Sequence, residues 1–244
     1  MSQVLNPVNT VAPLSNVAMV MRAVDRAISG TTRERLLVLH GHAGYGKTTA
    51  CTYAANKHRA YLVECCSHWS RKALLQGLLH EMGIAAGHNI SDMFNQAVDQ
   101  LARSGRPLII DEADHLVRNS TIELVRDIHD KSGAVVLLSG EEGLPSKLVK
   151  WARVHSRVLE WIPAQPADLS DIEHLARLYC PGVAIGADWL RELHKQTGGN
   201  TRRVTVNLNR LRSEIEHIKG DVTLAAWGQR GWYTGQSPEP RKAV

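Results

Sequence analysis

The 244-residue sequence lacks any apolar run approaching the roughly 20 residues that a membrane-spanning helix requires. Residues 1–15 also lack the basic and then apolar order of a secretory signal. These two absences exclude a membrane-embedded transporter or receptor and a classical secreted protein. We therefore expect a cytoplasmic protein that has no membrane partner.

Cysteine is scarce, and no two cysteines have the CxxC spacing of a structural zinc site. The four are Cys51, Cys65, Cys66 and Cys180, which is too few for a disulfide framework. Cys65 and Cys66 with His68 form the one cluster that could suggest a metal. Adjacent cysteines bind a single zinc poorly, and no second ligand pair follows, so we predict buried thiols beside a surface histidine.

The remaining composition is ordinary, with 43% hydrophobic and 22% charged residues. The formal net charge is +5. A positive surface of this kind suits a polyanionic partner such as nucleic acid, but many ordinary enzymes carry one too. The charge alone does not decide between these two interpretations.

Short apolar segments alternate with amphipathic ones along the first two thirds of the chain. The apolar segments predict five strands, at residues 36–39, 60–63, 107–111, 134–139 and 157–161. Apolar residues at helical spacing lie between them, and we expect Ser70 and Ser91 to begin two of the helices. The alternation predicts an α/β fold, a five-stranded parallel sheet covered by helices on both faces.

The strand pattern stops at Pro163, and only helical patterns follow. Ser170–Glu173 has the sequence of a capping box, and Gly198 and Gly199 end a second helix. We therefore predict four parts: an extended arm (1–15), an α/β domain (16–162), a helical lid (163–228) and a disordered tail (229–244).

Gly41–Thr48 satisfies the GxxxxGK[ST] pattern, with a predicted strand directly before it and a helix directly after. In this pattern the glycines allow backbone N–H groups to point at phosphate oxygens. We expect Lys47 to reach the β- and γ-phosphates of ATP and the Thr48 hydroxyl to bind Mg²⁺. The predicted nucleotide contacts are Gly41, Gly44, Tyr45, Gly46, Lys47, Thr48 and Thr49.

A second acidic motif ends the strand at residues 107–111. Asp111 would be costly to bury without a partner, and Mg²⁺ is the natural one. Glu112 follows it and is placed to orient or deprotonate the attacking water. The Asp-Glu pair favours ATP hydrolysis over phosphate transfer by a nucleotide kinase.

Residues 111–114 also spell Asp-Glu-Ala-Asp, the motif that names a class of RNA helicases. Those enzymes need a second α/β domain with its own arginine motif. No α/β pattern follows Pro163, so we reject the helicase interpretation.

With both motifs placed, the pattern resembles the AAA+ superfamily, an α/β nucleotide domain followed by a helical lid. Ser139, at the end of the predicted fourth strand, matches the polar sensor-1 residue. The stretch from Gly198 to Arg203 is similar to the sensor-2 element, in which an arginine touches the γ-phosphate. The resemblance implies this role for Arg202 first and for Arg203 second, although both could be basic residues on a solvated helix face.

AAA+ proteins complete their site with an arginine finger from a neighbouring subunit. The resemblance places the candidates at Arg153 and Arg157, and Arg157 matches the position just before the last strand.

Three stretches narrow the resemblance: residues 108–116, residues 137–144 and the Gly-Gly-Asn-x-Arg element. Together they look like the branch with the MuB- and TnsC-type transposition ATPases and the ExeA-like secretion ATPases. That branch implies a bacterial or phage-infected cell, ATP and Mg²⁺ as cofactors, and a ring or filament of identical subunits on duplex DNA. A transposase would be the protein partner.

Two departures from the branch bear on this interpretation. The arm at 1–15 is too short for the helix-turn-helix of Mu phage B protein, so we expect the ATPase domain itself to hold DNA. We also expect no membrane segment of the ExeA type.

For the phosphate backbone of DNA the candidates are Arg71 and Lys72, although these could simply be a solvated helix start. Two alternatives stay open: a helicase loader, and a secretion or signalling ATPase that acts on protein alone.

Overall fold

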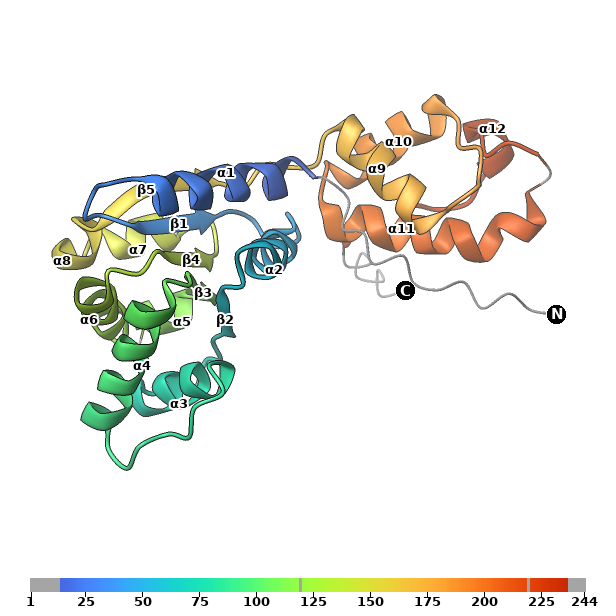
Figure 1. Ribbon diagram of the computed structural model, residues 1–244. Helices are drawn as coiled ribbons and strands as arrows, with labels where there is room; N and C mark the ends of the chain where they lie inside the picture. Colours follow the sequence, from blue (N-terminus) through green and yellow to red (C-terminus); the bar gives the residue numbers. More distant parts are fainter. Residues whose placement is uncertain (1–13, 119, 219, 237–244) are drawn as a thin grey trace, which may run out of the picture. The chain divides into compact units, whose positions relative to one another are not determined.

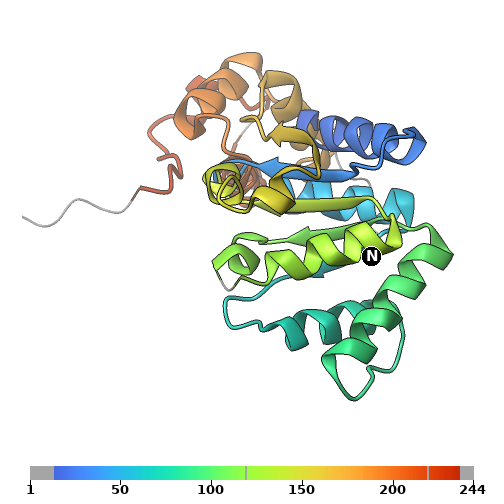
Figure 2. The same cartoon turned by 90° about the vertical axis from the view of Figure 1, so that its left-hand side faces the viewer.

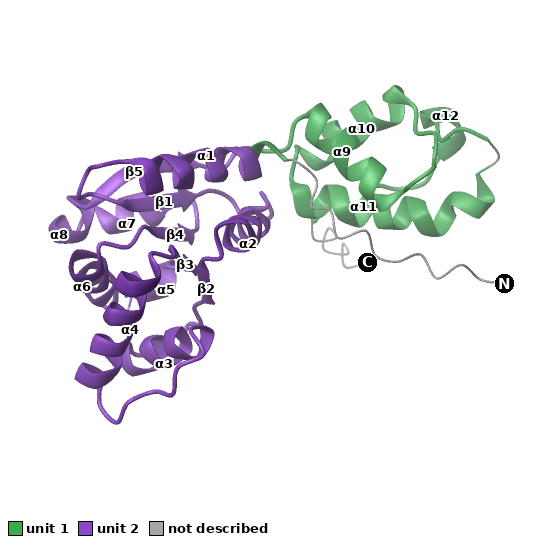
Figure 3. Ribbon diagram, in the orientation of Figure 1, with its two compact units in different colours: residues 1–15, 166–244 green, residues 16–165 purple. Residues whose placement is uncertain are grey.

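The computed structural model describes residues 14–118, 120–218 and 220–236. The chain divides into two compact units, an α/β unit of residues 16–165 and a helical unit that begins at residue 166 and includes Ser15 (Figure 3). Most of the arm predicted at 1–15, and residues 237–244 of the predicted tail, lie outside the described residues.

The α/β unit is built on five parallel strands in the order β2-β3-β4-β1-β5. Their bounds are β1 Leu36–His40, β2 Tyr61–Glu64, β3 Leu108–Asp111, β4 Val136–Gly140 and β5 Val158–Pro163. Each lies within two residues of a predicted strand, so the predicted five-stranded parallel sheet is confirmed. The three central strands β3, β4 and β1 are almost wholly buried, which explains why their sequences are continuously apolar.

Eight helices belong to the described part of this unit. They are α1 Ser15–Ser29, α2 Lys47–His58, α3 Arg71–Glu81, α4 Ile90–Ser104, α5 Asp114–Arg118, α6 Ile122–Ser132, α7 Leu144–Leu148 and α8 Ala152–His155. Figures 1 and 2 show α2 and α6 on opposite faces of the sheet, with α3 and α4 packed together beside the β2 edge. This arrangement leaves the carboxyl ends of the strands free to carry the loops of the site.

The strand order places β4 between β1, which leads into the glycine-rich loop, and β3, which ends at the acidic pair. Leu39 of β1 is paired with Ser139 of β4, and Glu64 of β2 with Asp111 of β3. The ends of three neighbouring strands therefore meet at one edge of the sheet, as the sequence predicts for Ser139.

The helical unit consists of α9 Leu169–Tyr179, α10 Ala187–Thr197, α11 Thr201–Glu214 with a short 3₁₀ turn Ile215–His217, and α12 Leu224–Trp227. Its centre holds the aromatic rings of Trp189, Trp227 and Trp232, whose centroids lie 5.1 to 5.6 Å apart. α10 ends at Gly198, whose φ is 59°, as the glycine pair predicts.

Two predicted helix starts are corrected by the structure. The side chain that caps α4 is Asn89 and not Ser91, and the one that caps α9 is Asp168 and not a residue of the Ser170–Glu173 capping box. Both true caps lie two residues earlier and accept a backbone N–H three residues on, at 2.9 and 2.8 Å. The expected cap of α3, Ser70, accepts the N–H of Ala73 at 3.3 Å.

Residues 228–236 differ from the disorder that their composition predicts. The buried side chain of Asn207 on α11 donates to the carbonyl of Tyr233 and accepts its N–H, both at 2.9 Å. Asn207 also donates to the carbonyl of Arg203 at 2.9 Å. One fully buried amide thus fixes this part of the tail along α11.

Candidate functional site

The glycine-rich loop runs from Gly41, directly after β1, to Lys47, the first residue of α2. Gly44 and Gly46 have φ angles of 84° and 79°, in the left-handed region that residues with side chains rarely adopt. Gly41 is buried, and a Cβ there would lie only 2.8 Å from that of Ala164. The backbone path of the loop therefore requires glycine at these three positions.

The first turn of α2 has no side-chain cap, so its N–H groups remain available to a ligand at the loop. The Lys47 ammonium donates to the carbonyl oxygens of Gly41 at 2.7 Å and His42 at 3.0 Å, across the mouth of the loop. Thr48 and Thr49 are exposed in the same turn. The arrangement is a cradle for a phosphate chain, with the ammonium at its entrance.

Asn16, near the start of α1, fixes the tip of this loop and was not predicted from the sequence. Its side-chain amide donates to the carbonyls of Tyr45 and Gln165, each at 2.8 Å, and accepts the Gln165 N–H at 2.9 Å. The side chain is buried. In the sequence, the signal for this role is an asparagine beside the apolar residues that begin α1, and it does not identify the partners of Asn16.

Asp111 ends β3 and is buried, with only 3% of the residue exposed. One carboxylate oxygen, Oδ1, accepts the N–H of Glu112 at 3.0 Å. The other, Oδ2, is buried without a hydrogen-bond partner among the described residues. Burying half of a carboxylate unpaired is unfavourable unless a cation completes it, as the sequence predicts for Mg²⁺.

Glu112 has a φ of 54°, one of three residues other than glycine with positive φ in the described chain. Such a conformation costs about 1–3 kcal/mol and persists at functional sites where the surroundings enforce it. Burial, and then the charge of Asp111, raise the pKa of the Glu112 carboxyl above its usual value, and Lys47 partly opposes them. The carboxylate is therefore a stronger base than an exposed glutamate.

Ser139 is fully buried at the end of β4, and its hydroxyl has no nitrogen or oxygen partner among the described residues. The Cys51 thiol of α2 lies beside it and also senses the charge of Asp111. Burial raises the pKa of Cys51 to about 12, so this thiol stays protonated and packs as an apolar group. Ser139 thus offers an unsatisfied hydroxyl to whatever occupies the site.

These groups fit ATP with Mg²⁺. The unsatisfied oxygens of Asp111 and Ser139 and the exposed Thr48 hydroxyl lie on the three segments that meet at the loop. Oxygen ligands of this kind suit Mg²⁺, which is held by one or two protein groups together with phosphates. Asp111 and Thr48 would hold the ion.

Cys65, Cys66 and His68 do not form a metal site in the described part of the chain. Cys65 is buried, and burial raises its pKa to about 12. Cys66 is exposed, so the prediction that both thiols are buried is wrong for Cys66. Within the described residues, no group of three or more His, Cys, Asp or Glu side chains is placed to share a metal ion. No described helix is long and apolar enough to span a membrane.

The two candidate finger arginines differ in their surroundings. Arg157 makes a two-pronged ion pair with Asp130 of α6, at 2.8 Å from Nε and 3.2 Å from Nη2. This pairing raises the pKa of Arg157 and lowers that of Asp130. Arg153 on α8 is exposed. Arg157 would have to leave Asp130 to act on another subunit, whereas Arg153 would not.

The sensor-2 candidates begin α11 in the helical unit. Asn200 caps this helix by accepting the N–H of Arg203 at 3.2 Å. Arg202 is exposed, whereas the Arg203 guanidinium packs against the tail, where a Cβ on Gly235 would lie 2.9 Å from Arg203 Nε. Within this unit Arg202 is the more accessible of the two.

The DNA candidates Arg71 and Lys72 are both exposed in the first turn of α3. Arg71 makes one long hydrogen bond, 3.5 Å, to the carbonyl of Ser120. The structure therefore leaves both cations accessible to a partner.

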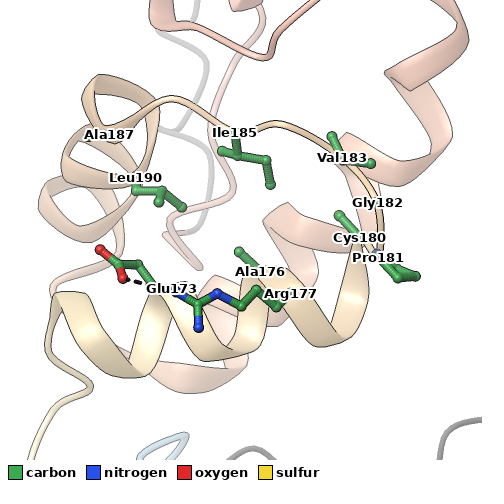
Figure 4. Close-up of a pocket in the computed structure, with 10 residues that line it drawn as sticks. All are labelled: Glu173, Ala176, Arg177, Cys180, Pro181, Gly182, Val183, Ile185, Ala187 and Leu190. Carbon is green, nitrogen blue, oxygen red and sulfur yellow. Dashed lines mark ion pairs between the residues drawn. The ribbon is translucent and has the colours of Figure 1, made fainter.

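A pocket of about 460 Å³ opens in the helical unit, lined by residues of α9, α10 and the loop between them (Figure 4). Its lining is mainly apolar, and its charged groups, Glu173 and Arg177, face each other at 3.7 Å. It contains none of the predicted site residues.

The parallel sheet, the glycine-rich loop and the acidic pair at the end of β3 define the α/β unit as a P-loop domain of the AAA+ fold. In agreement with this, residues 30–148 match the family model AAA_22, described as an AAA domain. None of the curated proteins matches the chain.

Solved structures share the fold at low sequence identity. CDC6P from Pyrobaculum aerophilum has a TM-score of 0.65 at 16% identity, over 89% of this chain and 66% of its own. The Aeropyrum pernix ORC1 protein, solved in complex with DNA, has a TM-score of 0.58 at 17% identity, over 86% of this chain and 62% of its own. The Thermotoga maritima RuvB Holliday junction branch migration motor has a TM-score of 0.59 at 16% identity, over 87% of this chain and 67% of its own. This chain thus spans about two thirds of their length, and the likeness is one of fold.

Proposed function

We propose that the α/β unit binds ATP with Mg²⁺ and hydrolyses it. The observation that carries the proposal is the Asp111–Glu112 turn, where a half-unsatisfied buried carboxylate precedes a glutamate held in the left-handed region. Each feature is energetically unfavourable by itself, and a bound cation and an activated water would account for both.

Each residue then has one task. The N–H groups at the start of α2 and the Lys47 ammonium bind the phosphates, and the Ser139 hydroxyl donates a hydrogen bond to a phosphate oxygen. Glu112 accepts the proton of the attacking water, for which its raised pKa suits it. When bound, Mg²⁺ neutralises developing charge on the phosphate oxygens.

Two arginines complete the proposed site. Arg202 is our candidate for sensor 2, because it is the exposed member of the pair at the start of α11. For the finger we now propose Arg153 ahead of Arg157, because Asp130 already binds the Nε–Nη2 edge of the Arg157 guanidinium. A finger acts on the γ-phosphate of a neighbour, so the proposal includes a homo-oligomer.

Nucleotide binding is tested by titrating the chain with ATP. Lys47→Ala should abolish binding, because the phosphates lose the ammonium at the mouth of the cradle. Lys57→Ala, at the other end of α2, is the matched control. Equal affinity in both variants would remove the site assignment.

We further propose that ATP assembles the chain into a ring or filament on duplex DNA. The net charge of +5 and the exposed Arg71 and Lys72 support a phosphate-binding surface. The similarity of fold to an ORC1 solved with DNA and to a branch migration motor also supports a nucleic-acid partner. Contacts to phosphates alone would give salt-sensitive binding with little sequence preference.

Transposition is the role that we propose for this assembly, on the sequence resemblance to MuB- and TnsC-type ATPases. The filament would mark a target and engage a transposase, which would stimulate hydrolysis and release. The likeness to CDC6P and ORC1 gives the helicase-loader alternative comparable support.

ATP-dependent co-sedimentation with duplex DNA, followed by imaging, separates these functions. Assembly that grows with DNA length supports the filament, and rings that ignore DNA support an ATPase that acts on protein. Replacing Arg71 and Lys72 with alanine should weaken DNA binding and reduce its salt dependence while ATP affinity stays unchanged. A double variant that binds DNA normally would place the contact elsewhere.

A further inference from the structure

Asp114, the fourth residue of the Asp-Glu-Ala-Asp stretch, has no part in the reaction proposed above, yet its carboxylate is buried at the start of α5. Its Oδ2 accepts the backbone N–H of Glu141, just after β4, at 2.6 Å. Its Oδ1 accepts the Lys147 ammonium of α7, also at 2.6 Å. Each carboxylate oxygen therefore has a short, charge-assisted partner on the segment that follows β4.

The segment after β4 is shaped to admit this carboxylate. Gly140 lies so close to Asp114 that a Cβ there would overlap Oδ2. One residue earlier in each segment, the Ala113 N–H donates to the Ser139 carbonyl at 2.8 Å. Two successive hydrogen bonds, Ala113 to Ser139 and Glu141 to Asp114, thus join the two segments.

The joined segments carry the two groups that must face the same phosphate. Ser139 belongs to the first of these hydrogen bonds, and Glu112 immediately precedes Ala113. The left-handed backbone of Glu112 is unfavourable by itself and needs such neighbours to hold it. The Lys147 charge in turn stabilises the buried carboxylate, and Asp114 raises the pKa of Lys147.

We infer that Asp114 is a positioning residue that sets the distance between the water-activating Glu112 and the phosphate-sensing Ser139. The inference rests on the proposed ATP hydrolysis. Both carboxylate oxygens of Asp114 are already bonded to groups of the chain, so its loss should lower the turnover rate and leave ATP binding intact. Displacement of a catalytic group by about 1 Å can lower a rate by ~10²-fold.

The test compares Asp114→Ala with Asp114→Asn, measuring kcat and ATP affinity separately. Asp114→Ala should lower kcat by ~10²-fold while the Kd for ATP changes less than about twofold. Asp114→Asn keeps an acceptor oxygen for the Glu141 N–H and should recover most of the lost rate. Hydrogen exchange of the Glu141 amide should be fast in the alanine variant and protected in the asparagine variant.

Glu142→Ala, next in the chain and exposed, is the matched control and should behave like the wild type. If Asp114→Ala turns over ATP at the wild-type rate, or loses ATP affinity as much as kcat, the inference is overturned and the proposed hydrolysis stands. A wild-type chain that binds ATP without hydrolysing it overturns both. Asp114→Asn variants that stay as slow as alanine, with Glu141 protected, would also contradict the positioning role.

Discussion

At the scale of single residues, the carboxyl of Glu112 carries a testable pH dependence. Burial and the neighbouring Asp111 raise its pKa above that of an exposed glutamate. The base is the ionised form, so turnover is full above the raised pKa and is lost as the pH falls through it. We expect the acid limb of kcat/KM, which reports the free enzyme, to lie above the usual glutamate range, measured by phosphate release at ATP concentrations below KM.

Replacing Asp111 with asparagine removes the charge that helps to raise this pKa and also removes a Mg²⁺ ligand. Excess Mg²⁺ should restore part of the rate, and the acid limb should then move to lower pH. An acid limb that does not move would mean that another group titrates.

Asn16 makes a second prediction at this scale. Asn16→Ala leaves the carbonyls of Tyr45 and Gln165 without their donor, and each lost hydrogen bond costs about 0.5–1.5 kcal/mol. Since one of these groups belongs to the glycine-rich loop, ATP affinity should fall together with the melting temperature. The control is Asn56→Ala, farther along on the exposed side of α2. A loss of stability with unchanged ATP affinity would separate Asn16 from the nucleotide site.

The sequence predicts Gly41–Thr48, Asp111 and Glu112 because these residues form contiguous motifs whose chemistry is local. Asn16 and Asp114 could not be predicted in the same way. Their partners lie 29 to 149 residues away in the sequence for Asn16 and 27 to 33 for Asp114. Only the folded sheet brings those segments together.

At the scale of elements, strands were easier to predict than helix starts. A continuous apolar run predicts a buried parallel strand, as Leu36–Leu39 does. A helix start offers several competing caps, and at α4 and α9 the asparagine and aspartate were used in place of serines two residues on. The shift is within the usual uncertainty of a helix boundary.

The tail at 228–236 was missed because its composition is polar and rich in glycine, although its ordering depends on the buried Asn207. We expect Asn207→Ala to lower the free energy of unfolding by about 0.5–1.5 kcal/mol for each hydrogen bond lost to the Tyr233 backbone. Trp232 should then separate from Trp189 and change the tryptophan fluorescence. Asn209→Ala, an exposed position on the same helix, should change neither property.

If the Asn207→Ala variant melts like the wild type with the same fluorescence, the contact contributes nothing to stability. Loss of stability without a fluorescence change would mean that the aromatic cluster holds the tail by itself.

At the scale of the whole molecule, the two candidate fingers can be separated by mixing subunits. Arg153→Ala subunits should bind ATP yet fail to hydrolyse it in assemblies, and Lys47→Ala subunits should fail to bind it. Mixed interfaces can pair an intact glycine-rich loop from the first variant with an intact finger from the second, so mixing should restore some activity. The measurement is ATPase rate against mixing ratio on saturating DNA.

Arg157→Ala provides the comparison. Because it breaks an ion pair within its own subunit, we expect lower thermal stability and no rescue by mixing. Rescue of Arg157→Ala and not of Arg153→Ala would return the finger to Arg157, in agreement with its position before the last strand.

The central claim is that Glu112 activates water for ATP hydrolysis at the loop formed by Gly41–Thr48. The most direct test is Glu112→Gln, which keeps the shape of the side chain and removes its basic carboxylate. We predict that this variant binds ATP with Mg²⁺ as tightly as the wild type, while phosphate release falls by at least ~10²-fold. Release at the wild-type rate from a variant that binds ATP normally would contradict the account.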